Sequence, residues 1–224
     1  MLIDYQTLVD NLVRDDAGQI QPADRDDAIA LAVSRYSNDR PDTRVEDIVS
    51  AGGRYLDYPA GWQADFSALQ SLEYPVGEFP PSYLSGADWT IYASPVAEQI
   101  LLRITLDAGD TVRASYTVRR VLDDTTDTIP AGDREAVASY AAAVLCEALA
   151  SYYSGDSDST IQADSVDHAS KAREFASRAR GLRKRYYDAL GMDPKRNVAA
   201  GVVVDLDGKD SRGRDRLLHS GRYR

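Results

Sequence analysis

The 224-residue chain has little cysteine, little histidine and no long apolar run, and each shortage excludes a class of protein. One cysteine cannot close an intrachain disulfide, and two histidines cannot supply a site of several imidazoles. No basic N-terminal stretch precedes an apolar one, which argues against a signal peptide. The longest strongly apolar run, residues 141–146, is far shorter than the about 20 residues that span a bilayer. We therefore expect a cytoplasmic protein with no membrane helix.

Basic side chains are also few: the chain has 26 of them and 36 acidic ones, for a formal net charge of -10. A negative surface repels phosphate backbones at long range, so the composition argues against a general nucleic-acid binder. The imbalance is uneven, because residues 191–224 carry eight basic and five acidic side chains. The rest of the chain is therefore strongly acidic, and we expect it to need a basic or apolar partner.

Apolar residues at helical spacing predict two short helices in residues 1–44 and two long helices in residues 123–190. The third helix is predicted for residues 133–153, with an apolar stripe of Val137, Tyr140, Ala141, Val144, Leu145, Ala148, Leu149 and Tyr152. The fourth is predicted for residues 166–190, with a stripe of Val166, Ala169, Ala172, Phe175, Ala176, Ala179, Leu182 and Tyr186. These stripes predict that the helices share one core.

Residues 45–122 change to the alternating period of strands. Alternation on both sides of residues 107–110 predicts a β-hairpin over residues 99–118, and weaker strand candidates lie at 45–49, 55–58, 69–74 and 89–93. The predicted fold class is α+β, mainly α: a four-helix core with a β-rich insertion between the second and third helices and an extended C-terminal tail. The predicted parts are residues 1–44, 45–122, 123–190 and 191–224.

The sequence contains no complete motif for catalysis, for a cofactor or for a metal. Cys146 lies beside an apolar stripe with no nearby cation, and His168 is placed near the start of the last helix. Residues 205–216 lack the glycine and the glutamate that a calcium loop needs at its sixth and twelfth positions. We predict no catalytic, cofactor or metal site, although an enzyme using a pair of carboxylates, independent of metal, stays an alternative.

Two segments are candidates for partner binding. The last helix carries seven cations, which form either a solvated face or a face that docks onto the acidic N-terminal helices of an identical copy. Head-to-tail docking of this kind closes into a ring. The tail is poor in large apolar residues, so it is either a disordered solubilising segment or a segment ordered by a partner through strand addition or a pocket. The predicted contact residues are Arg178, Arg183, Lys184, Arg185, Val202, Val203, Val204, Leu217, Leu218, Arg222 and Tyr223.

The order of these elements resembles that of the head-to-tail connector, or adaptor, proteins of tailed bacteriophages. The likeness lies in PADRDDAI at residues 22–29, in residues 129–150 and in residues 164–187, and it is one of order and texture. It implies a structural protein of the virion neck, made in the host cytoplasm and without catalytic activity. Its partners would be identical copies in a dodecameric ring, the portal protein, and a stopper or tail completion protein.

The resemblance also implies that DNA passes through the ring without specific binding. An acidic channel wall would let the duplex slide, because it repels the phosphates. A competing interpretation of the same sequence is a small helical regulatory or binding module.

Overall fold

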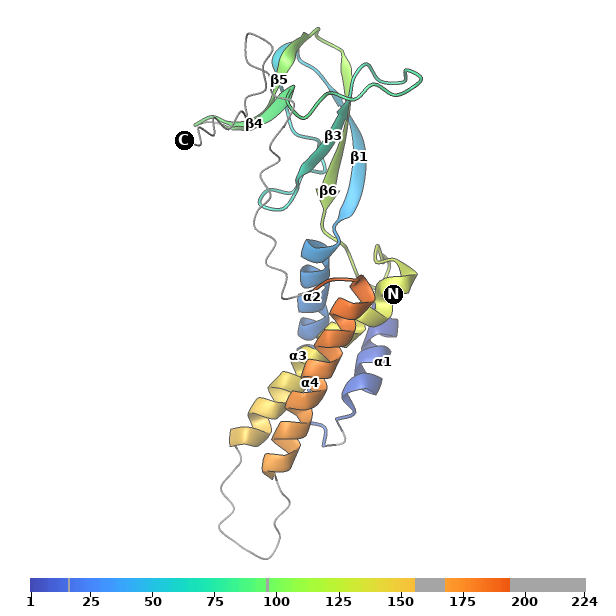
Figure 1. Cartoon of the computed structure of the whole chain (residues 1–224), viewed down its shortest axis with the longest axis vertical. Helices are drawn as coiled ribbons and strands as arrows, with labels where there is room; N and C mark the ends of the chain where they lie inside the picture. Colours follow the sequence, from blue (N-terminus) through green and yellow to red (C-terminus); the bar gives the residue numbers. More distant parts are fainter. Residues whose placement is uncertain (16, 96, 156–167, 194–224) are drawn as a thin grey trace, which may run out of the picture. The chain divides into compact units, whose positions relative to one another are not determined.

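The computed structural model describes residues 1–193 except 16, 96 and 156–167. In these residues, two α-helices precede six strands along the chain and two further α-helices follow them (Figure 1). The elements are α1 (Leu2–Val13), α2 (Pro22–Asp39), β1 (Asp42–Val49), β2 (Gly53–Leu56), β3 (Leu69–Glu73), β4 (Trp89–Ala93), β5 (Glu98–Leu106), β6 (Thr111–Val118), the short 3-10 helix η1 (Ala131–Asp133), α3 (Arg134–Gly155) and α4 (His168–Leu190).

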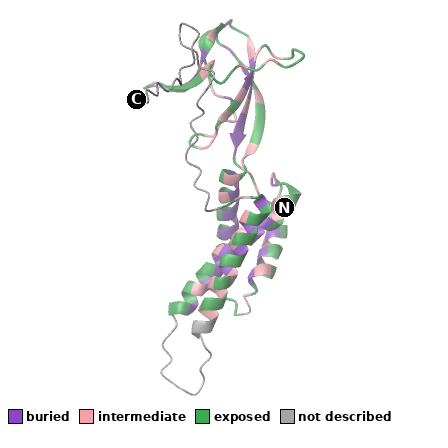
Figure 2. Ribbon diagram, in the orientation of Figure 1, coloured by how far each residue is buried: buried purple, intermediate pink, exposed green. Residues whose placement is uncertain are grey.

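We call α1, α2, η1, α3 and α4 the helical body. Its central helix is α3, which packs against α1, α2 and α4. The sequence of α3 explains this position, because small alanines such as Ala138 and Ala142 let neighbouring helices approach closely. Buried residues therefore occur around α3 rather than along one stripe. Figure 2 shows buried segments, in purple, within the helical body. The predicted stripe is wrong at Ala148 and Tyr152, which are exposed.

The helical segment that contains α3 is unusually apolar. By length and composition alone, the helical segment Ala131–Gly155 is long and apolar enough to cross a bilayer, contrary to the sequence-based expectation. In its most apolar window, however, 61% of the residues are buried inside the protein. Packing against three helices accounts for that composition, so the segment reads as a core helix.

The strands between α2 and η1, which we call the β region, form two three-stranded antiparallel sheets. Their orders are β1-β6-β3 and β2-β5-β4. The predicted β-hairpin of residues 99–118 is therefore wrong: both segments are strands, but they belong to different sheets. Alternation fixes which faces of a strand are buried, and it carries no information about which strand lies alongside.

Two corners carry the chain between the sheets, at residues 50–53 and 107–110. They bond to each other, because the Gly109 N–H donates to the Ser50 carbonyl (2.9 Å) and the Ser50 N–H donates to the Asp110 carbonyl (2.8 Å). Gly52 stands here with φ of 97°, a conformation that favours glycine. The corners thus replace the hairpin turn that the sequence predicted.

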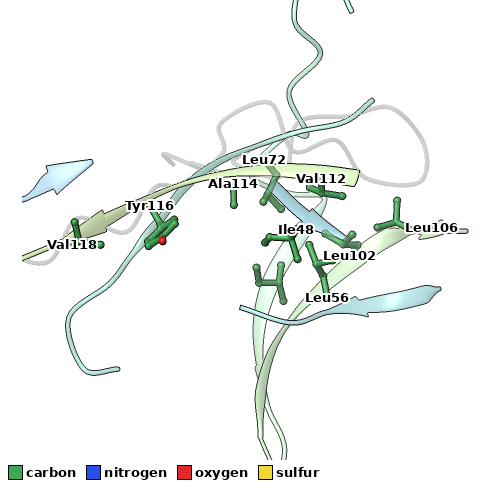
Figure 3. Close-up of a cluster of buried hydrophobic side chains, with 10 residues drawn as sticks. Ile48, Leu56, Leu72, Leu102, Leu106, Val112, Ala114, Tyr116 and Val118 are labelled. Carbon is green, nitrogen blue, oxygen red and sulfur yellow. The ribbon is translucent and has the colours of Figure 1, made fainter. Parts of the chain in front are cut away.

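The β region has a hydrophobic core of its own (Figure 3). Both sheets contribute to it: Ile48, Leu72, Val112, Ala114, Tyr116 and Val118 come from the first sheet, and Leu56, Ile100, Leu102 and Leu106 from the second. The predicted fold class, a mainly α four-helix core with one insertion, is wrong for this reason. The protein is 43% helical and 24% strand, and its two sheets bury a separate core.

Candidate subunit interface

An apolar groove of about 420 Å³ lies between α2 and α3. Val144, Ala148 and Tyr152 line it from α3, where a spacing of four residues places them on one helix face. Leu31 lines it from α2, and 53% of Leu31 and 52% of Tyr152 is exposed. Large apolar side chains left this open, side by side, are typical of a contact surface.

The groove has an acidic rim on α2. Asp24 and Asp27 line the same groove as Leu31, and all three residues are exposed. Their positions differ by three and four residues, so they share one face of the helix. An apolar floor with an acidic rim is suited to a partner surface that carries cations.

The cations that the sequence assigned to a partner are mostly used within the chain. Arg178 donates to the carbonyl of Val13 at the end of α1 (2.7 Å), and Arg183 pairs with Glu147 on α3 (2.6 Å). Arg185 pairs with Glu135, also on α3. Of the four predicted contact residues on α4, only Lys184 has no ion pair within the described part of the chain. The sequence could not separate these roles, because it does not reveal which face of α4 meets α3.

Lys184 and two further cations, Arg173 and Arg180, define what we call the cationic face of α4. All three are exposed, and spacings of seven and four residues align them along the helix. Among the described residues none of them forms an ion pair, and Arg180 donates a hydrogen bond to the Ala176 carbonyl (3.2 Å). Arg173 and Arg180 belong to the seven cations of the last helix but not to the predicted contact residues, because the sequence does not show which cations stay exposed.

No family model matches the chain. A search of the curated proteins finds no match to it either. The interpretation of the groove and the cationic face therefore rests on their geometry and on the residues that form them.

The remaining predicted contact residues, Val202–204, Leu217, Leu218, Arg222 and Tyr223, lie outside the described residues. Residues 205–216, the segment with some likeness to a calcium loop, also lie outside them. His168 is the first residue of α4, as expected. Within the described ranges, no group of three or more His, Cys, Asp or Glu side chains could hold a metal ion.

Several carboxylates of the β region and its exit serve as acceptors in structural contacts. A hydrogen bond from the Tyr116 hydroxyl (2.7 Å) lowers the pKa of Glu46, and the Arg113 guanidinium does the same for Asp47. The hydroxyl of Thr125 lowers the pKa of Asp123. A general acid working at neutral pH needs a raised pKa instead, so these three groups are unsuited to that role.

Cys146 is buried in α3, and burial raises the pKa of its thiol to about 11. Since only the thiolate reacts with alkylating agents, we expect no labelling of the folded protein by iodoacetamide near neutral pH. Mass spectrometry checks this result directly, because the chain has one cysteine. Labelling in denaturant is the control, and rapid labelling of the folded protein would contradict the burial.

Proposed function

We propose that the protein is a structural subunit of a head-to-tail connector in a tailed bacteriophage and assembles into a ring through its helical body. The observation that carries the proposal is that one subunit exposes two surfaces of opposite charge. The groove between α2 and α3 has an acidic rim and an apolar floor. The cationic face of α4 offers charges of the opposite sign.

The two surfaces are formed by different helices, the groove by α2 and α3 and the cationic face by α4. Tyr140 and Glu147 contact α4, through the Tyr186 ring and the Arg183 guanidinium respectively, whereas Val144 and Ala148 line the groove. Among the described residues, neither Asp24 nor Asp27 forms an ion pair with the cationic face of α4, so both surfaces are open to a second copy. Contact between such unlike surfaces on successive copies is heterologous, and it closes into a ring when the rotation allows.

The connector assignment gives this ring its role. The order of elements supports the resemblance to adaptors. Two shorter helices precede the strands, and two longer helices follow them. A ring of acidic subunits would repel DNA that passes through it, and its two ends would contact the portal protein and a stopper or tail completion protein. The dodecameric state and these partners come from the resemblance and are part of the proposal.

Charge reversal tests the interface. In Asp27→Lys or Lys184→Glu the subunit should fold normally but lose assembly, because like charges would then face each other across the contact. We expect at least a tenfold rise, on the order of 1.4 kcal/mol, in the concentration needed for rings, measured by native mass spectrometry and sedimentation velocity. The double variant should recover assembly, since it restores opposite charges.

Glu78→Lys is the matched control, because it makes the same charge change at an exposed loop position far from α2 in sequence. It should assemble like the wild type. A wild-type protein that stays monomeric even with purified portal protein would refute the proposed function. Normal rings in both single variants would refute this interface while leaving the connector role open.

A further inference from the structure

A second cleft, of about 800 Å³, opens in the β region and is lined by aromatic side chains. Tyr58, Trp62 and Phe66 come from the segment between β2 and β3, and Trp89 comes from β4. All four are half-buried, so part of each ring stays accessible. Trp62 and Trp89 are also the only two tryptophans of the chain.

The aromatic wall is held in place before any ligand arrives. The rings of Tyr58 and Trp62 are stacked, with centroids 4.2 Å apart and planes within 2° of parallel. Beneath them, the Glu46 carboxylate accepts hydrogen bonds from the N–H groups of Ala60 (3.0 Å) and Gly61 (3.2 Å). A side chain at Gly61 would collide with the Tyr116 hydroxyl, so this turn packs closely onto β6. A rigid wall loses little entropy when it binds a ligand.

The charges of the cleft select the kind of ligand. Its lining contains two carboxylates, Asp65 and Glu98, and no basic side chain. Aromatic faces attract cations, and carboxylates pair with them. Phe66 already makes a cation–π contact of this kind within the chain, because the Arg119 guanidinium lies 5.0 Å from its ring centroid.

Arginine fits this combination better than lysine or a sugar. Its planar guanidinium stacks on an aromatic ring and can donate two parallel hydrogen bonds to one carboxylate, whereas the ammonium of lysine is a point charge. A neutral sugar carries no charge to pair with the two carboxylates of this lining, whereas a guanidinium does. Trp, Tyr and Arg are also the residues that dominate the centres of protein interfaces.

We propose that this cleft binds an arginine-bearing peptide segment of a partner protein, with a guanidinium packed on the aromatic wall and paired with Asp65 or Glu98. The inference is independent of the ring interface, because the two surfaces share no residue. It assigns the β region a recognition role.

Intrinsic fluorescence tests the proposal, since both tryptophans line the cleft. The probe is a short acetylated peptide of alternating glycine and arginine, titrated into the full chain. We expect a saturable change in tryptophan emission, and no change with the matched peptide in which neutral citrulline replaces arginine. A lysine peptide should bind at least about threefold more weakly, because it lacks the planar fork.

Two variants test the carboxylates. Asp65→Asn suits the backbone, because Asp65 has φ of 64° and asparagine also tolerates this region. Asp65→Asn combined with Glu98→Gln should keep the melting temperature and weaken the arginine peptide about tenfold. The absence of a saturable response in the wild type, an equal response to the citrulline peptide, or saturable binding of neutral oligosaccharides in place of arginine would each overturn the proposal.

Discussion

The variant Leu145→Asp is expected to lose the folded state of the helical body. Leu145 lies in α3 with 3% of its surface exposed, among the apolar side chains of the central helix. Truncating such a leucine to alanine costs about 2–5 kcal/mol, and an unpaired carboxylate in the same place costs more. Domains are stable by about 5–15 kcal/mol, so this single change removes most or all of the margin. Circular dichroism should then show no cooperative melting of helix.

Leu31→Asp provides the matched control for this result. It introduces the same side chain into α2, at a position where 53% of the residue is exposed. The aspartate can stay in water there, so we expect a cooperative transition within about 1 kcal/mol of the wild type. A native melting curve for Leu145→Asp, or unfolding of both variants alike, would contradict the position of α3 at the centre of the body.

Helices were the part of the fold that the sequence predicted best. The third helix, expected at residues 133–153, is α3 (Arg134–Gly155), and Ala179, Leu182 and Tyr186 of the last predicted stripe are buried. Helical period is a local property that reports which face is apolar. Helical period wrongly predicted Ala148 and Tyr152 to be buried, because an apolar residue on a central helix can face either a neighbouring helix or an open groove.

Pairing of strands and pairing of charges were not predictable in the same way. Both depend on residues far apart in the chain, as in the contact of β6 with β1 or of Arg183 with Glu147, separated by 36 positions. The aromatic cleft is a third example. Trp62 and Trp89 are unremarkable as single positions, and only the packing of both sheets places them around one opening.

Arg120 connects the exit of the β region to the end of α2. Its backbone N–H donates to the Ser37 hydroxyl (3.0 Å), and its guanidinium donates to the carbonyls of Arg40 (3.2 Å), Pro41 (3.1 Å) and Thr128 (2.5 Å). The same guanidinium pairs with Asp42 at 3.0 Å. These partners all lie outside the hydrophobic core of the two sheets. A cut inside the β region can therefore leave this set of bonds intact.

Removal of the β region is the second large change, and it is expected to leave the helical body folded. Asp42 and Val118 are register partners of β1 and β6, so their Cα atoms are about 4.5–5.5 Å apart and a Gly-Gly linker can join them. Deleting residues 43–117 in this way removes the sheets with their separate core and keeps Arg120 beside Ser37. We expect cooperative melting of helical circular dichroism in the deletion variant, because its four helices keep their contacts with one another. Loss of the helical signal would show that the sheets are needed to fold the helices, because the deletion leaves every contact among α1, α2, α3 and α4 in place.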